Sequence, residues 1–379
     1  MNKRLNIKFV PSLIKKLSFL LSILLFSSSI VAQNNEQAFY NNLIIGTKVH
    51  YGFVISHHKY MEHLTNSHFP AFEINFNKQT YGNKLWQQLY HYPVIGIGYW
   101  HSDLGNSTIL GKADAIFPYI NFILKRQSNF TMNFRFGLGF GWLNERFARF
   151  ENYKNIAISS HLNGYVNLNY KLEWEFNRFF FSTGIGLMHL SNCAYKMPDL
   201  GINVGTVNLG VSYKIDNSKR ELIKKDLAPV KKLSEFYTIV SYGIKEIYPP
   251  CGKKYSEYNI SLNYSKILSH KNKILAGIDL FYDESNIEIL KRDSIDIKNK
   301  YSIIKPGVNV GYGLFFSKTS FIIQTGVYIY AKEKSDGLFY HRFALRHDIS
   351  KHFIINLSLK THFARADCME FGIGYRLAD

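Results

Sequence analysis

A strict two-residue alternation governs the stretch NFTMNFRFGLGFGWL, residues 129–143, and allows few folds. One parity is apolar throughout: Phe130, Met132, Phe134, Phe136, Leu138, Phe140 and Trp142. The other parity carries small or polar residues, among them three glycines and Arg135. Successive side chains of a strand point to opposite faces, so this stretch is a strand with one apolar face. A water-facing strand would carry long solvated side chains, whereas glycines and an arginine suit the narrow polar interior of a small barrel in lipid.

The same alternation recurs along the chain and predicts about eight strands in each half. The first eight are expected at 43–55, 68–80, 92–102, 115–125, 129–145, 163–176, 178–191 and 204–215. The second eight are expected at 235–247, 255–267, 273–284, 300–316, 319–332, 337–348, 352–364 and 368–377. A content of 16% aromatic residues with only 9 prolines suits so many strands. We therefore predict an all-β, transmembrane antiparallel barrel fold.

The two halves resemble degenerate repeats, residues 40–215 and 236–379. VHYGFVIS at 49–56 recurs as VSYGIKEI at 240–247, and each half ends in a glycine-containing strand. The polar segment 216–235 between them reads as a linker. Counting leaves two arrangements open, two barrels of eight strands or one of sixteen. The linker favours two barrels, because periplasmic turns within one barrel are short.

The first 32 residues are typical of a secretory signal peptide. Five lysines and arginines precede an apolar run that begins at Leu17, and small residues surround a cleavage point after Ala32. The run is shorter than the ~20 residues that a membrane-spanning helix needs. We expect cleavage near Ala32 and location in the bacterial outer membrane.

The remaining chain is strongly basic, with 41 lysines and arginines against 28 acidic residues. No nucleic-acid recognition signature accompanies this charge in an exported chain, so an anionic membrane surface is the favoured partner over nucleic acid. The alternative is that the charge only aids solubility. Cys193, Cys251 and Cys368 lack the spacing of a metal site, and no metal or cofactor is predicted.

The segment HLSNCAYKMPDLGIN, residues 189–203, ends one of these strands with polar residues on its apolar face. His189 and Ser191 continue the outward parity of Phe179, and Asn203 has outward parity on the next strand. A histidine beside a serine can act as base for a nucleophile, with a third group fixing the tautomer. The alternative is that these side chains simply meet the headgroup region.

These 15 residues resemble the signature of the outer-membrane lipid A 3-O-deacylase (PagL) or acyloxyacyl hydrolase family, and residues 40–215 resemble it in overall pattern. The resemblance implies an eight-stranded barrel with a lipid-facing serine esterase site that removes an ester-linked acyl chain from the lipid A of lipopolysaccharide. It also implies His189 as general base, Ser191 as nucleophile and Asn192 as an oxyanion donor.

One position departs from the family pattern. The acidic third member of the catalytic group falls on Asn203, which can hold a histidine tautomer but lacks a full charge. Asp199 stands where the family has asparagine, and could supply a carboxylate if the turn bends back. Asp199 and Gly201 lie in the turn expected to help bind substrate or oxyanion.

We interpret the other candidate residues as structural rather than as catalytic or metal-binding. In the second repeat, Thr361 and Phe363 stand at the matching positions, or His362 and Ala364 in a shifted register, so no second catalytic site is expected. The histidines of HHKYMEHLTNSHF, at 57, 58, 63 and 68, are read as a basic extracellular loop rather than a metal site.

Glu173 and Glu175 are read as lumen residues paired with Arg135 or Lys171, not as a catalytic pair. The alternatives to an esterase are a non-catalytic barrel that binds lipid or serves a structural role, and a porin if the repeats merge.

Overall fold

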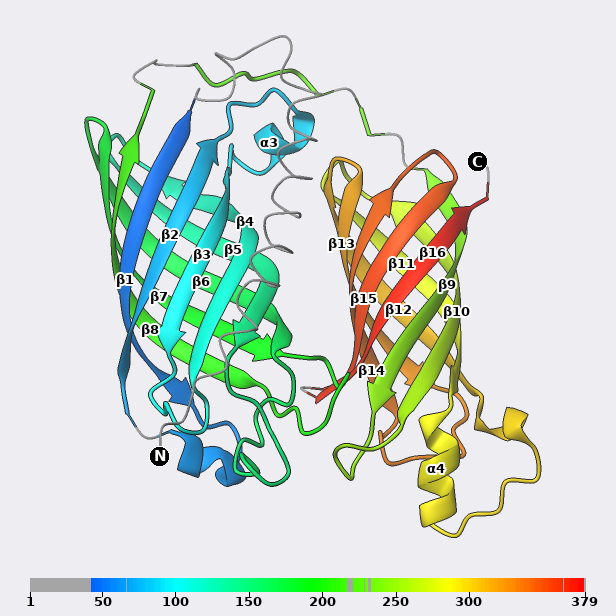
Figure 1. Cartoon of the computed structure of the whole chain (residues 1–379). Coiled ribbons are helices and arrows are strands. Elements are labelled where there is room, and N and C mark those ends of the chain that lie inside the picture. Colours follow the sequence, from blue (N-terminus) through cyan, green and yellow to red (C-terminus); the bar gives the residue numbers. More distant parts are fainter. Residues whose placement is uncertain are drawn as a thin grey trace, which may run out of the picture.

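Two closed antiparallel barrels make up the chain, β1 to β8 and β9 to β16 (Figure 1). The computed structural model describes residues 42–65, 67–216, 221–227, 229–230, 233–363 and 365–377. The predicted all-β fold is confirmed, and the sixteen-stranded alternative is wrong because β8 closes on β1 and β16 closes on β9. The predicted signal segment, residues 1–32, lies outside the described residues.

The strands follow the predicted alternating runs closely. In the first barrel they are β1 Leu43–Ile55, β2 Phe69–Gln79, β3 Val94–Asp103, β4 Lys112–Arg126, β5 Phe130–Leu143, β6 Leu162–Phe176, β7 Phe179–Ser191 and β8 Ile202–Lys214. In the second they are β9 Ser234–Glu246, β10 Lys254–Ile267, β11 Asn272–Asp283, β12 Lys305–Phe316, β13 Thr319–Tyr328, β14 Phe339–Asp348, β15 Phe353–His362 and β16 Arg365–Arg376.

Within the described residues, short helices lie between strands: η2 Lys59–Leu64, α3 Leu85–Leu89, α4 Ser285–Arg292 and η3 Lys300–Ile303. None of the helices in the described part of the chain is long and apolar enough to cross a membrane.

The apolar parity of each strand faces outward. On β5, Phe140 is 69% exposed, whereas Arg135 on the opposite parity is 1% exposed. An eight-stranded barrel is just wide enough for its own side chains, so the inward parity is buried without a second layer of protein. The exposed apolar bands are therefore the lipid-facing surface of both barrels.

Buried ion pairs fill the first lumen. Arg135 Nη1 lies 2.6 Å from Glu73 Oε1, and Lys48 Nζ lies 3.6 Å from the same oxygen. The expected pairing is correct for Glu173, which bonds Lys171, but wrong for Glu175, whose side chain is exposed at the strand end. Arg135 forms its ion pair with Glu73 rather than with Glu175, because the Glu73 carboxylate faces the guanidinium across the lumen.

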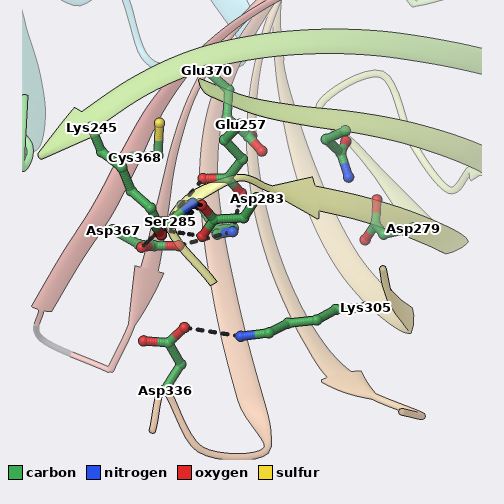
Figure 2. Close-up of polar contacts among 12 residues, drawn as sticks. Lys245, Glu257, Asp279, Asp283, Ser285, Lys305, Asp336, Asp367, Cys368 and Glu370 are labelled. Atoms are coloured by element: carbon green, nitrogen blue, oxygen red, sulfur yellow. Dashed lines mark hydrogen bonds and ion pairs between the residues drawn. The ribbon is translucent and has the colours of Figure 1, made fainter. Parts of the chain in front are cut away.

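The second lumen holds a denser charge network at its loop end (Figure 2). Glu257, Asp283 and Asp367 bring carboxylate oxygens within 4.8 Å of one another, close enough for a metal ion. Lys245 already lies 2.6 Å from Asp283, and Lys360 lies 2.8 Å from Asp367. The two lysines offset most of the negative charge of these three carboxylates, so we assign the group to the stability of the barrel.

Most of the long loops of both barrels lie at the same end (Figure 1). The segments 56–68, 144–161 and 192–201 lie there in the first barrel, while the opposite end has tight turns such as 177–178 and one longer segment, 80–93, which holds α3. Long loops mark the extracellular end of such barrels. Beneath them, Met188 and Leu190 on the inward face of β7 pack in a buried apolar cluster with Trp100 and Tyr165, which anchors the end of β7.

We predict that Glu73→Ala lowers the free energy of unfolding of the first barrel by about 3–5 kcal/mol, because Arg135 and Lys48 lose their buried counter-charge. Trp100, Trp142 and Trp174 lie on strands of the first barrel, whereas Trp86 lies in α3 and packs on Phe316 of the second, so tryptophan fluorescence during urea titration in a Trp86→Phe background reports on the first barrel. Glu175→Ala, at an exposed carboxylate, is the control. Equal stabilities for the two variants would contradict the prediction.

Candidate active site

The register of β7 and β8 places His189 directly opposite Asn203. Both residues belong to the outward parity, and His189 Nδ1 lies 2.6 Å from Asn203 Oδ1. Direct cross-strand neighbours have Cβ atoms only about 5 Å apart, so the sheet itself presents the amide to the imidazole.

A chain of hydrogen bonds fixes the tautomer of His189. The carbonyl of Leu200 can only accept, so His57 Nε2, 2.9 Å away, is the donor. With its proton on Nε2, His57 accepts at Nδ1 from Asn203 Nδ2, 3.1 Å away. This turns Asn203 Oδ1 toward His189, whose Nδ1 must carry the proton. The lone pair of His189 is therefore at Nε2, where a general base needs it.

Ser191 lies two residues beyond His189 and is bonded to the loop that follows. Its hydroxyl donates to Asp199 Oδ2 at 2.8 Å and accepts from the Cys193 N–H at 3.0 Å. Among the described residues, no hydrogen bond joins Ser191 to His189. The turn thus bends Asp199 back to the serine, while Asn203 bonds the histidine.

The Asp199 carboxylate organises the loop 192–201. It accepts from the backbone N–H groups of Asn192 and Ala194, each at 3.1 Å, in addition to the Ser191 hydroxyl. Burial raises the pKa of Asp199 to about 6, and these hydrogen bonds act in the opposite direction. The carboxylate form, which accepts three hydrogen bonds, therefore prevails only above about pH 6.

Asn192 serves the same loop. Its Nδ2 donates to Ser159 Oγ at 3.2 Å and to the Lys196 carbonyl at 3.0 Å. Its Oδ1 accepts from the Lys196 N–H at 2.9 Å. Both Nδ2 hydrogens are thus used within the protein, so in this arrangement Asn192 orders the loop and leaves no donor for an oxyanion.

Gly201 allows the loop to pass against the catalytic histidine candidate. Its φ is +78°, and a Cβ there would lie 2.8 Å from His189 Cε1. Its N–H donates to the Ala157 carbonyl at 2.9 Å, so it too is bonded inside the protein. A side chain at this position would be strained and would push the imidazole away from Asn203.

An apolar wall extends from the site along β7, β8 and β1. Ile185 is 61% exposed, Val207 58% and Phe53 46%, all on the outward parity. Acyl chains in a bilayer would lie against this wall, with the polar site at its extracellular edge.

The remaining candidates do not join this site. His63 bonds the Lys154 carbonyl, and His68 stacks on Tyr51, in agreement with the loop interpretation. In the second barrel, His362 turns into the lumen and bonds Tyr328 at 3.0 Å. Ala364 lies outside the described residues.

Sequence reasoning missed His57, which was grouped with the loop histidines. The signal available was its position two residues after β1, because Ile55 pairs with Asn203 across the barrel closure.

Fold and site together describe a β-barrel that carries a histidine bonded to an asparagine on its outer face, with a serine two residues from the histidine. Residues 70–212 match the family model described as lipid A 3-O-deacylase (PagL), and residues 234–379 match that described as acyloxyacyl hydrolase, C-terminal domain. The chain belongs to this PagL family of ester hydrolases, whose setting is the outer membrane.

Other comparisons add only distant likenesses. No curated protein matches the chain. Neisserial surface protein A is 10% identical with a TM-score of 0.33, covering 46% of this chain and 98% of its own. The monoaromatic hydrocarbon channel TodX is 8% identical with a TM-score of 0.18, covering 88% and 89%. A Rh. blastica porin mutant is 6% identical with a TM-score of 0.17, covering 88% and 99%. We infer nothing further from them.

We predict that Gly201→Ala lowers lipid A deacylation by on the order of tenfold or more, because the new methyl group displaces the His189 ring. Mass spectrometry of lipid A from membranes carrying the variant measures the loss. Gly337→Ala is the matched control, since Gly337 also has positive φ, +81°, but a Cβ there meets no atom within 4 Å. Equal activity in both variants would contradict the prediction.

Proposed function

We propose that this protein is a serine esterase of the outer membrane that removes an ester-linked acyl chain from lipid A. Ser191 is the nucleophile and His189 the general base. The observation that carries the proposal is the 2.6 Å bond from His189 Nδ1 to Asn203 on the lipid-facing side of β7, two residues from Ser191. It leaves Nε2 of the histidine free to take a proton.

The reaction follows from these positions. Ser191 Oγ attacks the ester carbonyl, and its proton passes to His189 Nε2. The tetrahedral intermediate collapses as its bond to the ester oxygen of lipid A breaks, and the imidazolium gives this proton to that oxygen, which remains on lipid A as a hydroxyl group. Water activated by His189 then hydrolyses the acyl-serine, releasing a fatty acid and restoring Ser191. No metal or organic cofactor takes part.

Asp199 holds Ser191 in the substrate-free arrangement. For attack, the hydroxyl turns about χ1 from Asp199 toward His189, a change within one side chain. Hydrogen bonds at catalytic sites often tighten only when substrate is bound. The carboxylate then remains bonded to the Asn192 and Ala194 N–H groups and keeps the loop in place.

The membrane supplies the substrate from the side. Acyl chains lie along the exposed wall of Ile185 and Val207, and the excess of lysine and arginine suits the phosphates of lipid A.

We also propose that residues 1–32 direct export and are removed after Ala32. Residues 40–215 form the catalytic unit, 216–235 the linker and 236–379 a repeat without a catalytic site.

Three variants test the assignment. We expect Ser191→Ala to abolish deacylation and His189→Gln to lower it by about 10²–10⁴-fold, the usual contribution of a general base. Asp199→Asn should cost only on the order of tenfold through a looser loop. Because the pKa of Asp199 is raised to about 6, wild-type activity should begin to fall near that pH. Asp199→Asn should remove this contribution and leave the fall at lower pH that protonation of His189 causes.

Mass spectrometry of lipid A and pH-rate profiles give the readout. If Asp199→Asn is as inactive as Ser191→Ala while His189→Gln stays active, the carboxylate is the base and our assignment is wrong. If Ser191→Ala leaves the same acyl pattern as wild type, the barrel is not an esterase, which is the non-catalytic alternative.

A second test concerns His57. His57→Ala removes the acceptor that orients the Asn203 amide, so the amide can turn and present its NH2 group to His189. We expect kcat to fall by about fivefold, the cost of one hydrogen bond of roughly 1 kcal/mol. His63→Ala, in the same segment 56–68 and bonded to the Lys154 carbonyl, is the control, since the neighbouring His58 packs on the His57 ring. Equal kcat in the two variants would show that the Asn203 orientation does not depend on His57.

A further inference from the structure

The second barrel touches the loop that holds Ser191 and Asp199. At the end of β9, the Glu246 N–H donates to the Ala194 carbonyl at 2.9 Å. At the start of β10, Lys254 Nζ donates to the Tyr195 carbonyl and lies 4.2 Å from the centre of the Tyr195 ring. Both contacts reach peptides inside loop 192–201, at the extracellular end where the barrels' loops meet (Figure 1).

The second barrel presents these donors from an ordered β9–β10 loop. Glu246 is buried, and its Oε2 lies 3.0 Å from Lys254 Nζ. Its Oε1 accepts from the Gly252 N–H at 2.9 Å, which closes the loop on itself. A further bond joins the barrels here, from Arg149 Nη2 to the Pro250 carbonyl at 3.1 Å. The Glu246 carboxylate therefore holds the Lys254 ammonium group in the position where it contacts Tyr195.

The peptides that receive these contacts have an unfavourable backbone. Cys193 and Ala194 have φ of +58° and +60°, a left-handed conformation that costs free energy for residues other than glycine. In this conformation the Cys193 N–H reaches Ser191 Oγ and the Ala194 N–H reaches Asp199. Such a strained arrangement persists only where its surroundings support it.

We propose that the second barrel positions the active site of the first: Glu246 and Lys254 hold peptides 193–195 in the strained conformation that places Ser191 and Asp199. This inference rests on the proposed esterase function. It assigns a task to a barrel that lacks a base and nucleophile pair of its own. Glu246 and Lys254 are positioning residues, since they contact neither the reacting atoms nor Ser191.

Lys254→Ala in the full-length protein tests the proposal. We expect kcat for lipid A deacylation to fall by about tenfold with KM unchanged, because the loop loses its outside support. Loss of the Ala194 N–H bond, which lowers the pKa of Asp199, should also move the acid limb of the pH-rate profile to higher pH. Lys254→Arg should restore both, since a guanidinium can donate to the same carbonyl.

Lys253→Ala is the matched control, because this neighbouring lysine of the same loop packs on Tyr255 of its own barrel. We expect wild-type kcat and pH dependence for it. If Lys254→Ala equals Lys253→Ala in kcat and in its acid limb while Ser191→Ala is inactive, the positioning role is overturned and the esterase function stands. If Ser191→Ala is itself active, the proposed function fails first.

Discussion

Every backbone N–H and C=O group inside a bilayer must find its partner within the protein, because hydrocarbon offers none. Closing β1 on β8 and β9 on β16 meets this requirement, since each ring of strands has no free edge. Closure also fixes the direction of every side chain, so alternate residues face either lipid or a narrow lumen. The apolar wall, the buried charges and the outward site all depend on this one constraint.

The narrow lumens decide where chemistry can occur. Ion pairs such as Arg135 with Glu73 and Arg342 with Glu370 fill them, and breaking one would leave an uncompensated buried charge. Neither lumen has room for a substrate of the size of lipid A. A site on the outward parity at the rim meets both the acyl chains of the bilayer and the water needed for hydrolysis.

The two-residue periodicity of the sequence allowed most strands, and the face of the candidate site, to be predicted. The run 43–55 is the observed β1, whereas 300–316 begins late, at Lys305, because residues 300–303 form a short helix. Parity also gave His189, Ser191 and Asn203 a common face. Asp199 and His57 were beyond its reach, because they approach through loops. The loop with Asp199 passes through the left-handed Cys193 and Ala194 and contacts the second barrel, and His57 bonds the Leu200 carbonyl from the segment after β1. No local pattern reveals these contacts.

The asparagine at position 203 follows from the cost of charge at a lipid-facing site. A carboxylate there would be desolvated whenever His189 is neutral. Asn203 avoids that cost, since Oδ1 accepts from His189 while Nδ2 donates to His57. Asn203 does not, however, place a full negative charge beside the protonated imidazole of His189. That charge lies instead on Asp199, where backbone N–H groups can hold it. In the proposed mechanism, two residues therefore share what one aspartate does in a Ser-His-Asp triad: Asn203 fixes the tautomer of His189, and Asp199 carries the negative charge.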